Sequence, residues 1–348
     1  MELVVNIQKQ LGAFHLDVSF SAGQGVTGVL GASGCGKSLT LKCIAGIERP
    51  DRGRITLNGR VLFDSRLRID LPPQQRRVGY LFQSYALFPN LTVEQNIAAG
   101  VRERSRRKEE AARLMAAFQL EECRGKYPRQ ISGGQQQRTA LARILASQPQ
   151  ALLLDEPFSA LDSYLKWQIE MDLMDRLSQF QGPALFVTHS LEEISRQCRQ
   201  VCVLDQGRSQ PVQTVEQLFQ APATLSACRL SGCENLSPAR GRPEGGLLAQ
   251  DWGLVLETDR PFPPDFSHVG IRACHILPAP GPGPNRFLCR AVRQVEGRER
   301  TTLLLRPADS PAAVPLRMEW EKGRPLPLSP AGELWAELPG QQLLLLSR

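Results

Sequence analysis

One short stretch, Gly31 to Ser38, constrains the fold more than any other part of this sequence. Its letters, GASGCGKS, fit the phosphate-binding pattern G-x-x-x-x-G-K-[ST]. A short apolar run over 26–30 precedes the stretch, and a run with apolar residues at helical spacing follows over 39–47. A loop that joins a buried strand to a helix start turns backbone N–H groups and the positive helix end toward bound phosphate. The stretch therefore predicts an α/β fold with a nucleoside triphosphate site.

The side chains of this loop have different expected tasks. Lys37 is expected to reach the β- and γ-phosphates, and the Ser38 hydroxyl is expected to bind Mg²⁺. The loop backbone and the first helical turn supply the other contacts. The residues expected to bind the nucleotide here are Gly31, Ser33, Gly34, Cys35, Gly36, Lys37, Ser38 and Leu39.

A second apolar run, over 151–154, ends in two carboxylates, Asp155 and Glu156. The run is too short for a helix, and a buried parallel strand ends in this way at a ligand crevice. We expect Asp155 to hold Mg²⁺, and Glu156 to orient the water that attacks the γ-phosphate or to accept its proton. A plain strand whose carboxylates lie at a helix N-terminus is the structural alternative.

The stretch Ile131 to Arg138 lies between these two parts and contains the letters SGGQ. Ser132 and Gln135 form the pattern of a capping box, which predicts another helix start. The stretch resembles the signature motif of ATP-binding-cassette (ABC) ATPases. This resemblance implies ATP and Mg²⁺ as cofactors and a head-to-tail homodimer, in which the signature of one protomer closes over the nucleotide of the other. The signature residues concerned are Ser132, Gly133, Gly134 and Gln135.

Three more motifs lie where this family would place them. Gln83 resembles the glutamine that senses and binds Mg²⁺ and connects the core to a helical subdomain. His189 resembles the switch histidine that hydrogen-bonds the γ-phosphate, and Asp162, in the stretch 159–162, resembles part of the loop that contacts the opposite protomer. Taken singly, these residues have plainer alternatives: a surface glutamine, a histidine without a function and a helix-start turn. With Glu156, the resemblance makes Gln83 and His189 the expected catalytic residues.

The residue that stacks on adenine is open. The family often uses an aromatic side chain ahead of the phosphate loop, and Phe14 and His15 are the candidates. Alternation places Phe14 on the same face as Leu16, Val18 and Phe20, which favours a core position. Adenine stacking and core packing are therefore both open for Phe14.

Length and composition exclude several classes of protein. No apolar run in the 348 residues approaches the ~20 needed to cross a bilayer. The start, Met1 to Val5, leads directly into a strand-like segment, so no signal peptide is expected. The nine cysteines lack a Cys-x-x-Cys pair and are expected to be reduced thiols. The net charge of +7 is mild. The sequence does not show the interleaved basic and aromatic residues that are typical of nucleic-acid binding, so nucleic acid is not an expected partner.

The organisation of the chain changes near residue 235, since 16 of the 26 prolines lie beyond it. We expect a nucleotide-binding domain over 1–234, with a helical linker over 218–230, and a C-terminal domain over 235–348. Short β-like runs in the second domain predict a small open all-β barrel of the OB type. The Pro/Gly stretch 278–284 is expected to be irregular. The β-like runs cover 254–256, 269–272, 287–295, 301–305, 316–320, 334–338 and 343–346.

An ATP-binding cassette followed by a small β-rich (TOBE/MOP-type) tail resembles the import ATPases of bacterial binding-protein-dependent transporters. Within that group, the stretches 58–65, 71–80 and 332–336 look most like molybdate-importer ATPases, with importers of sulfate, other oxyanions or polyamines as alternatives. The resemblance implies two membrane-spanning permease subunits and a periplasmic or lipid-anchored substrate-binding protein as partners. It also implies a peripheral location on the cytoplasmic face of the bacterial plasma membrane, with contact to the permeases through residues 85–89 and the helix start at 92–95. A soluble, non-transport ABC ATPase is the alternative from another class.

Overall fold

The computed structural model of the chain describes residues 1–158, 163–325 and 328–347. The described chain forms two compact units, Met1–Val215 and Glu216–Arg348. Two short helices, α8 (Val215–Gln220) and α9 (Leu225–Leu230), stand where a single helical linker was expected, and α9 contacts β22 (Leu344–Ser347) of the second unit. The division between residues 234 and 235 stays a prediction about the domains.

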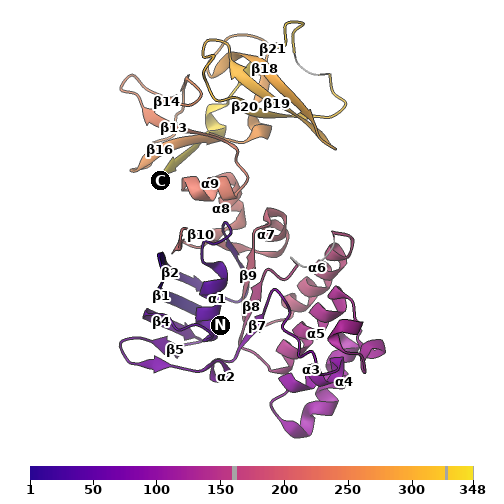
Figure 1. Cartoon of the computed structure of the whole chain (residues 1–348). Helices are drawn as coiled ribbons and strands as arrows, with labels where there is room; N and C mark the ends of the chain where they lie inside the picture. The colour runs from indigo at the N-terminus through magenta and orange to yellow at the C-terminus, as the bar shows by residue number, and fades with distance from the viewer. Residues whose placement is uncertain (159–162, 326–327, 348) are drawn as a thin grey trace. The chain divides into compact units, whose positions relative to one another are not determined.

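A large mixed sheet organises the first unit (Figure 1). Its strand order is β6-β5-β4-β1-β2-β11-β10-β3-β9-β8-β7, and β12 pairs with β10. The strands are β1 (Leu3–Leu11), β2 (Phe14–Ala22), β3 (Gly25–Leu30), β4 (Arg52–Leu57), β5 (Arg60–Asp64), β6 (Ile69–Asp70), β7 (Val78–Leu81), β8 (Ala151–Asp155), β9 (Pro183–Thr188), β10 (Gln200–Asp205), β11 (Arg208–Ser209) and β12 (Gln213–Thr214).

The sheet has an antiparallel part and a parallel part, which differ in residue pattern. In β2, side chains alternate between buried and more exposed, as expected when one face of an antiparallel sheet packs on a core. In β8 and β9, every residue is buried, as expected of central parallel strands covered on both faces. The strands β10, β3, β9, β8 and β7 are all paired in parallel, so their carboxyl ends lie at one edge.

The helices of the first unit separate into two groups. α1 contacts β7 and β8, while α6 and α7 contact β3. α3, α4 and α5 contact one another beside β7, on the opposite side of the sheet from β1, β2 and β4 (Figure 1). The bounds are α1 (Lys37–Ala45), α2 (Pro73–Arg76), α3 (Val93–Gly100), α4 (Arg107–Ala117), α5 (Gly133–Ala146), α6 (Ser163–Ser178) and α7 (Leu191–Gln197).

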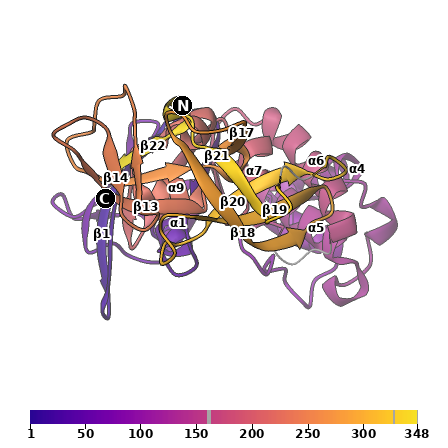
Figure 2. The ribbon, with the colours of Figure 1, turned by 90° about the horizontal axis from the view of Figure 1, so that it is seen from above.

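The second unit consists mainly of two antiparallel sheets, with strand orders β15-β14-β13-β16-β22 and β17-β21-β18-β19-β20. Seen from above, the labelled strands of the two sheets lie to different sides of this unit (Figure 2). The expected fold class, an α/β cassette followed by a small all-β domain, is thereby confirmed. The remaining bounds are β13 (Asn235–Gly241), β14 (Leu247–Ala249), β15 (Leu254–Leu256), β16 (Phe266–Ile271), β17 (Leu277–Ala279), β18 (Arg286–Glu296), β19 (Arg300–Pro307), β20 (Leu316–Glu321) and β21 (Glu333–Glu337).

All seven expected β-like runs of the tail coincide with strands, but three further strands contradict the sequence pattern. β13 contains Pro238, β17 contains Pro278, and β14 is only three residues long. The expectation that 278–284 is irregular throughout is wrong at its start, because Pro278 pairs with Ala336 of β21. β17 is an edge strand. Edge strands tolerate proline, because their outer side has no neighbouring strand that needs a hydrogen bond from the N–H that proline lacks.

Candidate nucleotide site

The residues expected to act on a nucleotide gather at one edge of the parallel sheet. The phosphate loop follows β3, Asp155 ends β8, and His189 follows β9. Gln83 lies two residues after β7, and these four strands are neighbours in the order β3-β9-β8-β7. Ligands of open α/β sheets bind outside the carboxyl ends of the strands, and the strand order brings these residues to that edge of the sheet.

The phosphate loop has a backbone that only glycine adopts readily. Gly34 has φ +79° and Gly36 has φ +106°, both in the left-handed region. At Gly31, an added Cβ would lie 2.3 Å from the Leu204 carbonyl oxygen, so any side chain there would displace the loop. The loop is therefore held as a tight turn that brings its N–H groups to the start of α1.

Lys37, the first residue of α1, is nearly buried and lies under the loop. Its ammonium donates hydrogen bonds to the carbonyl oxygens of Gly31 (2.8 Å) and Ala32 (2.9 Å). These two contacts hold the charge at the mouth of the loop. Cys35 is also buried, and this burial raises the pKa of its thiol, with Lys37 acting in the opposite direction.

Asp155 is held by two hydroxyl groups. Ser38 Oγ donates to Asp155 Oδ1 at 2.8 Å, and the Tyr80 hydroxyl donates to Asp155 Oδ2 at 2.7 Å. Burial, followed by the hydrogen bond to Asp155, raises the pKa of Tyr80, so the phenol is a neutral donor. The structure thus brings two of the three expected Mg²⁺ ligands, Ser38 and Asp155, together. Tyr80 is a further residue of the site, and its role was not predicted from the sequence. The only feature that could have indicated it is a tyrosine hydroxyl within an apolar stretch.

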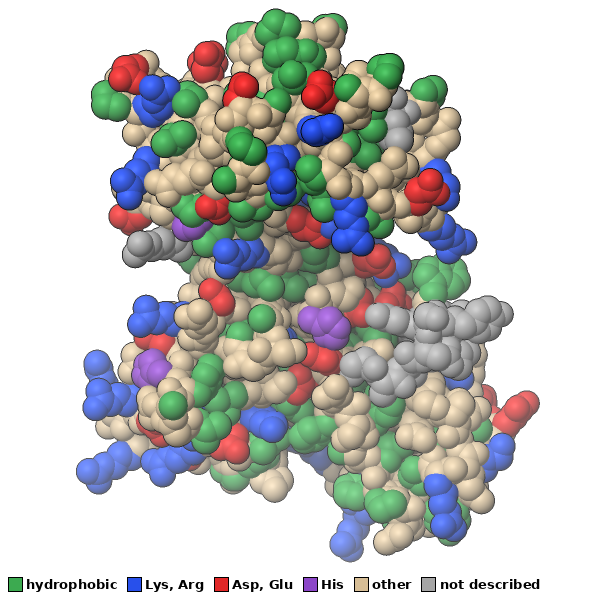
Figure 3. All heavy atoms as spheres, turned by 45° about the horizontal axis from the view of Figure 1, so that its top comes forward, with side chains coloured by type: hydrophobic (Ala, Val, Ile, Leu, Met, Phe, Trp, Pro, Cys, Tyr) green, Lys and Arg blue, Asp and Glu red, His purple; other side chains and the backbone are tan. Residues whose placement is uncertain are grey.

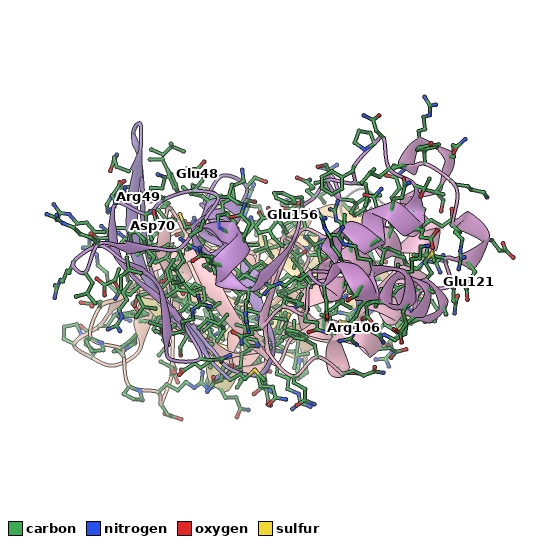
Figure 4. All side chains as sticks on the ribbon, turned by 90° about the horizontal axis from the view of Figure 1, so that it is seen from below. Glu48, Arg49, Asp70, Arg106, Glu121 and Glu156 are labelled. Carbon is green, nitrogen blue, oxygen red and sulfur yellow. The ribbon has the colours of Figure 1, made fainter. Side chains whose placement is uncertain are left out.

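Glu156 has a strained backbone, with φ +44°. Its N–H donates to the Val187 carbonyl of β9 at 3.0 Å, which holds the chain in this sharp turn. The His189 Nδ1 atom lies 3.6 Å from Glu156 Oε1. Figure 4 shows Glu156 between the strand-rich part that carries Arg49 and Asp70 and the helical part of the unit. Two of the three expected catalytic residues, Glu156 and His189, are therefore adjacent.

Gln83 is exposed, and the residues that follow it, 85–88, are held against the rest of the unit. Tyr85 is buried, so the expectation that 85–89 forms a contact surface does not extend to its side chain. Phe88 is 49% exposed, and the guanidinium of Arg143 on α5 lies 5.0 Å from the centre of its ring. Arg143 also donates to the Tyr85 carbonyl at 3.1 Å, so this segment is attached to α5.

The signature stretch starts α5 as expected. Ser132 is the N-cap, its Oγ accepts from the Gln135 N–H at 3.3 Å, and the Gln135 side chain accepts from the Ser132 N–H at 3.0 Å. Ser132 and Gly133 are exposed, while Gly134 is buried in the first turn. The capping box is confirmed, and it leaves the helix start facing solvent.

Phe14 lies beside the phosphate loop without being a free surface residue. It is half-buried on β2, packs against the main core, and its Cζ would lie 3.1 Å from a Cβ added at Gly36. His15 is exposed, and its Nδ1 lies 3.0 Å from Gln10 Oε1. The core position that alternation favoured is therefore present, and adenine stacking stays a prediction. Asp162 lies outside the described residues.

Charges of both signs are interspersed on the face of the molecule shown in Figure 3. The net charge of +7 is therefore not gathered into one basic patch on that face. None of the helices in the described part of the chain combines the length and hydrophobicity of a membrane span.

Comparison with known proteins matches the ABC transporter family to residues 14–159, a range that contains the phosphate loop and the signature. The solved dimeric structure of the ATP-binding cassette MJ0796 in a post-hydrolysis state, bound to ADP and Pi, is also similar. It is 27% identical, with a TM-score of 0.51 over 62% of this chain and 99% of that one.

Relatives of several kinds share the cassette. The Fe(3+) ions import ATP-binding protein FbpC of Haemophilus influenzae is 41% identical over 64% of this chain and 64% of its own length. The molybdenum import ATP-binding protein ModC of Paramagnetospirillum magneticum is 37% identical over 71% of this chain and 65% of its own length. In both cases the match spans slightly less than two thirds of the relative.

A third relative matches nearly from end to end. The sulfate/thiosulfate import ATP-binding protein CysA 2 of Chromobacterium violaceum is 37% identical over 347 residues, which is 96% of this chain and 92% of that protein. Both the cassette and the β-rich tail are included in this match. The chain therefore belongs to the import ATP-binding proteins of the ABC transporter family.

Proposed function

We propose that this protein is the ATP-hydrolysing subunit of a binding-protein-dependent importer. The observation that carries the proposal is the convergence of Lys37, Asp155 and Glu156 at the carboxyl ends of β3 and β8, two parallel strands on either side of β9. A cation for the phosphates, a carboxylate for the metal and a carboxylate for the attacking water are the groups that phosphoryl transfer to water requires.

The residues present fit ATP and Mg²⁺. Gly34 leaves open space at the loop, because a Cβ added there would meet no atom within 4 Å, and the Ser38 hydroxyl and Asp155 carboxylate supply hard oxygen ligands side by side. Mg²⁺ prefers one or two protein oxygens together with phosphate oxygens and water. Ser38, Asp155 and Gln83 would hold the metal, which when bound would neutralise charge on the phosphates.

In this proposal, Glu156 orients the attacking water and accepts its proton. His189, whose Nδ1 lies 3.6 Å from Glu156 Oε1, would hydrogen-bond the γ-phosphate and hold the glutamate in position. The left-handed backbone at Glu156 ends the extended strand directly after Asp155. These two neighbours in sequence act on different atoms, one on the metal and one on water.

The exposed capping box of α5 supports a role in a dimer. Its N–H groups and helix dipole would attract the γ-phosphate of a nucleotide bound by a second protomer. ATP then joins the protomers through Lys37 on one side and Ser132, Gly134 and Gln135 on the other, and hydrolysis releases them. Asp162 belongs to the same proposal as a contact to the opposite protomer.

The proposed partners are a second copy of this chain, two membrane-spanning permeases and a substrate-binding protein. The exposed Phe88, stacked under Arg143 of α5, offers an apolar contact point for a permease at the cytoplasmic face of the bacterial plasma membrane. No nucleic acid is among the proposed partners.

We further propose a tetrahedral oxyanion as cargo, with molybdate as the sequence-based choice and sulfate as the alternative. The relative that matches through the β-rich tail is named for sulfate and thiosulfate, which supports the oxyanion class over iron or polyamines. The molybdenum relative matches over 71% of this chain and the sulfate/thiosulfate relative over 96%, so molybdate has the weaker support of the two.

Glu156→Gln tests the enzymatic proposal. The amide keeps the shape of the side chain but cannot accept the proton, so ATP binding should persist while turnover falls by at least about 100-fold. Closed dimers should then accumulate with ATP and Mg²⁺, which size-exclusion chromatography detects.

Glu192→Gln is a matched control, because Glu192 is an exposed glutamate at the start of α7 that pairs with Arg196. It should hydrolyse ATP at the rate of the unchanged protein. A strictly monomeric Glu156→Gln variant with unchanged hydrolysis would contradict the assignment of Glu156.

A further inference from the structure

Both carboxylate oxygens of Asp155 accept a hydrogen bond from a hydroxyl group. Ser38 occupies Oδ1 at 2.8 Å and Tyr80 occupies Oδ2 at 2.7 Å. The two donors come from distant parts of the chain, the start of α1 and the middle of β7. Because each of its two oxygens accepts a hydrogen bond from a different donor, the orientation of the Asp155 carboxylate is fixed.

We propose that Tyr80 is a positioning residue for Mg²⁺: its hydroxyl holds Asp155 Oδ2 so that Oδ1 faces the metal beside the Ser38 hydroxyl. The inference rests on the proposed function, because it assumes that Ser38 and Asp155 hold the metal of a bound nucleotide. Partners of metal ligands commonly orient them in this way, and their loss weakens metal binding about 10- to 100-fold.

The environment makes Tyr80 a rigid donor. Its side chain is 9% exposed, and its ring centre lies 4.3 Å from that of Phe82. β7 pairs in parallel with β8, and Tyr80 lies opposite Leu153, two residues before Asp155. The hydroxyl therefore reaches Asp155 from the neighbouring strand, and the strand pairing fixes the distance between them.

Core packing is the plainer role for Tyr80, because its ring belongs to the buried cluster of the cassette. The two roles differ in what the hydroxyl does. If only the ring matters, removing the oxygen changes stability and leaves the metal unaffected. If the hydroxyl positions Asp155, its removal weakens Mg²⁺ binding while nucleotide binding without metal is unchanged.

Tyr80→Phe separates these roles, with Tyr85→Phe as the matched control. Tyr85 is also a buried tyrosine, and its hydroxyl bonds the Pro157 carbonyl at 3.5 Å instead of a metal ligand. Binding of a fluorescent N-methylanthraniloyl ATP is measured in EDTA and then titrated with Mg²⁺. We expect Tyr80→Phe to weaken the apparent Mg²⁺ affinity about tenfold with unchanged affinity in EDTA, and Tyr85→Phe to change neither.

Equal Mg²⁺ affinity of Tyr80→Phe and the unchanged protein would overturn the inference, and so would an equal loss of nucleotide affinity with and without metal. If the unchanged protein itself shows no Mg²⁺-dependent nucleotide binding, the proposed function fails instead.

A second measurement covers the case in which Tyr80→Phe does not fold. The chain has four tyrosines, so 3-fluorotyrosine labelling gives four ¹⁹F signals, and replacing the other three tyrosines one at a time assigns that of Tyr80. The Tyr80 signal should shift when Mg²⁺ is added to the ATP-bound protein. A signal that ignores Mg²⁺ would reject the positioning role.

Discussion

At the scale of single residues, this cassette depends on polar groups that are buried and paired. Arg76 is fully buried, and its guanidinium donates to the carbonyl oxygens of Cys43 and Ile44 at the end of α1 and to Asp70. These bonds satisfy carbonyls that a helix end leaves without partners. The buried cysteine thiols are uncharged, and burial raises their pKa because it disfavours the charged thiolate.

The buried thiols predict a loss of stability in alkaline solution. Burial raises the pKa of Cys289 to about 12 from an ordinary value of 9.0, and Cys43, Cys198 and Cys202 reach the same value. Between these values the unfolded thiol ionises while the folded thiol stays protonated. The free energy of unfolding should therefore fall with pH above about 9, by about 1.4 kcal/mol per pH unit for each thiol. Urea unfolding at pH 8 and pH 10 measures this slope.

Cys289→Ala should make that slope shallower by the contribution of one thiol. Cys274 is the exposed cysteine of the chain, so Cys274→Ala is the control and should leave the slope unchanged. Identical slopes in both variants would show that the Cys289 thiol ionises as readily in the folded protein as in the unfolded chain.

At the scale of elements, helix starts decide where the chemistry can occur. α1 begins after Gly36 in the phosphate loop and ends at Gly46, whose φ of +79° terminates the helix. α3 and α5 both begin with full capping boxes, from Thr92 and Ser132. The local structure of these two starts is the same, so any functional difference between them comes from their surroundings.

Ser132→Ala and Thr92→Ala test that difference. Each removes the hydroxyl of a capping box and should lower the free energy of unfolding by about 1 kcal/mol. In the Glu156→Gln background, Ser132→Ala should also reduce the ATP-induced dimer, because the hydroxyl is proposed to contact the nucleotide of the other protomer. Chemical unfolding and size-exclusion chromatography measure the two effects. Equal dimer populations in both variants would restrict Ser132 to capping.

At the scale of the whole molecule, the two units differ in what they indicate about the transported cargo. The cassette matches relatives named for iron, molybdenum, sulfate and polyamines, so its residues do not distinguish the cargo. This is expected of the proposed importer, in which the nucleotide site binds ATP and the cargo binds elsewhere. The β-rich tail is included in the match to the sulfate/thiosulfate relative.

Uptake by cells that lack this protein decides the cargo. If the cargo is molybdate, radiolabelled molybdate uptake at trace concentration should be lost, with sulfate uptake unchanged. Tungstate should compete, because it has the same tetrahedral shape and charge and a site of fixed hydrogen-bond donors distinguishes the two poorly. Normal molybdate uptake with impaired sulfate uptake would reject molybdate in favour of sulfate.

Much of this protein follows from short contiguous stretches. The phosphate loop, the two carboxylates after 151–154 and the capping box at Ser132 were predictable because each uses neighbours in sequence whose roles depend on local backbone geometry. The seven β-like runs of the tail were predictable for the same reason, since alternation is a local pattern.

Contacts between distant segments were decided only by the tertiary structure. Tyr80 meets Asp155 because β7 pairs with β8, and His189 approaches Glu156 because β9 adjoins β8. The strands β13 and β17 form in spite of Pro238 and Pro278, since their neighbours supply pairing that outweighs local propensity. A sequence states which residues can carry a charge or donate a bond, but the strand order and register of the folded sheet determine which of them face each other.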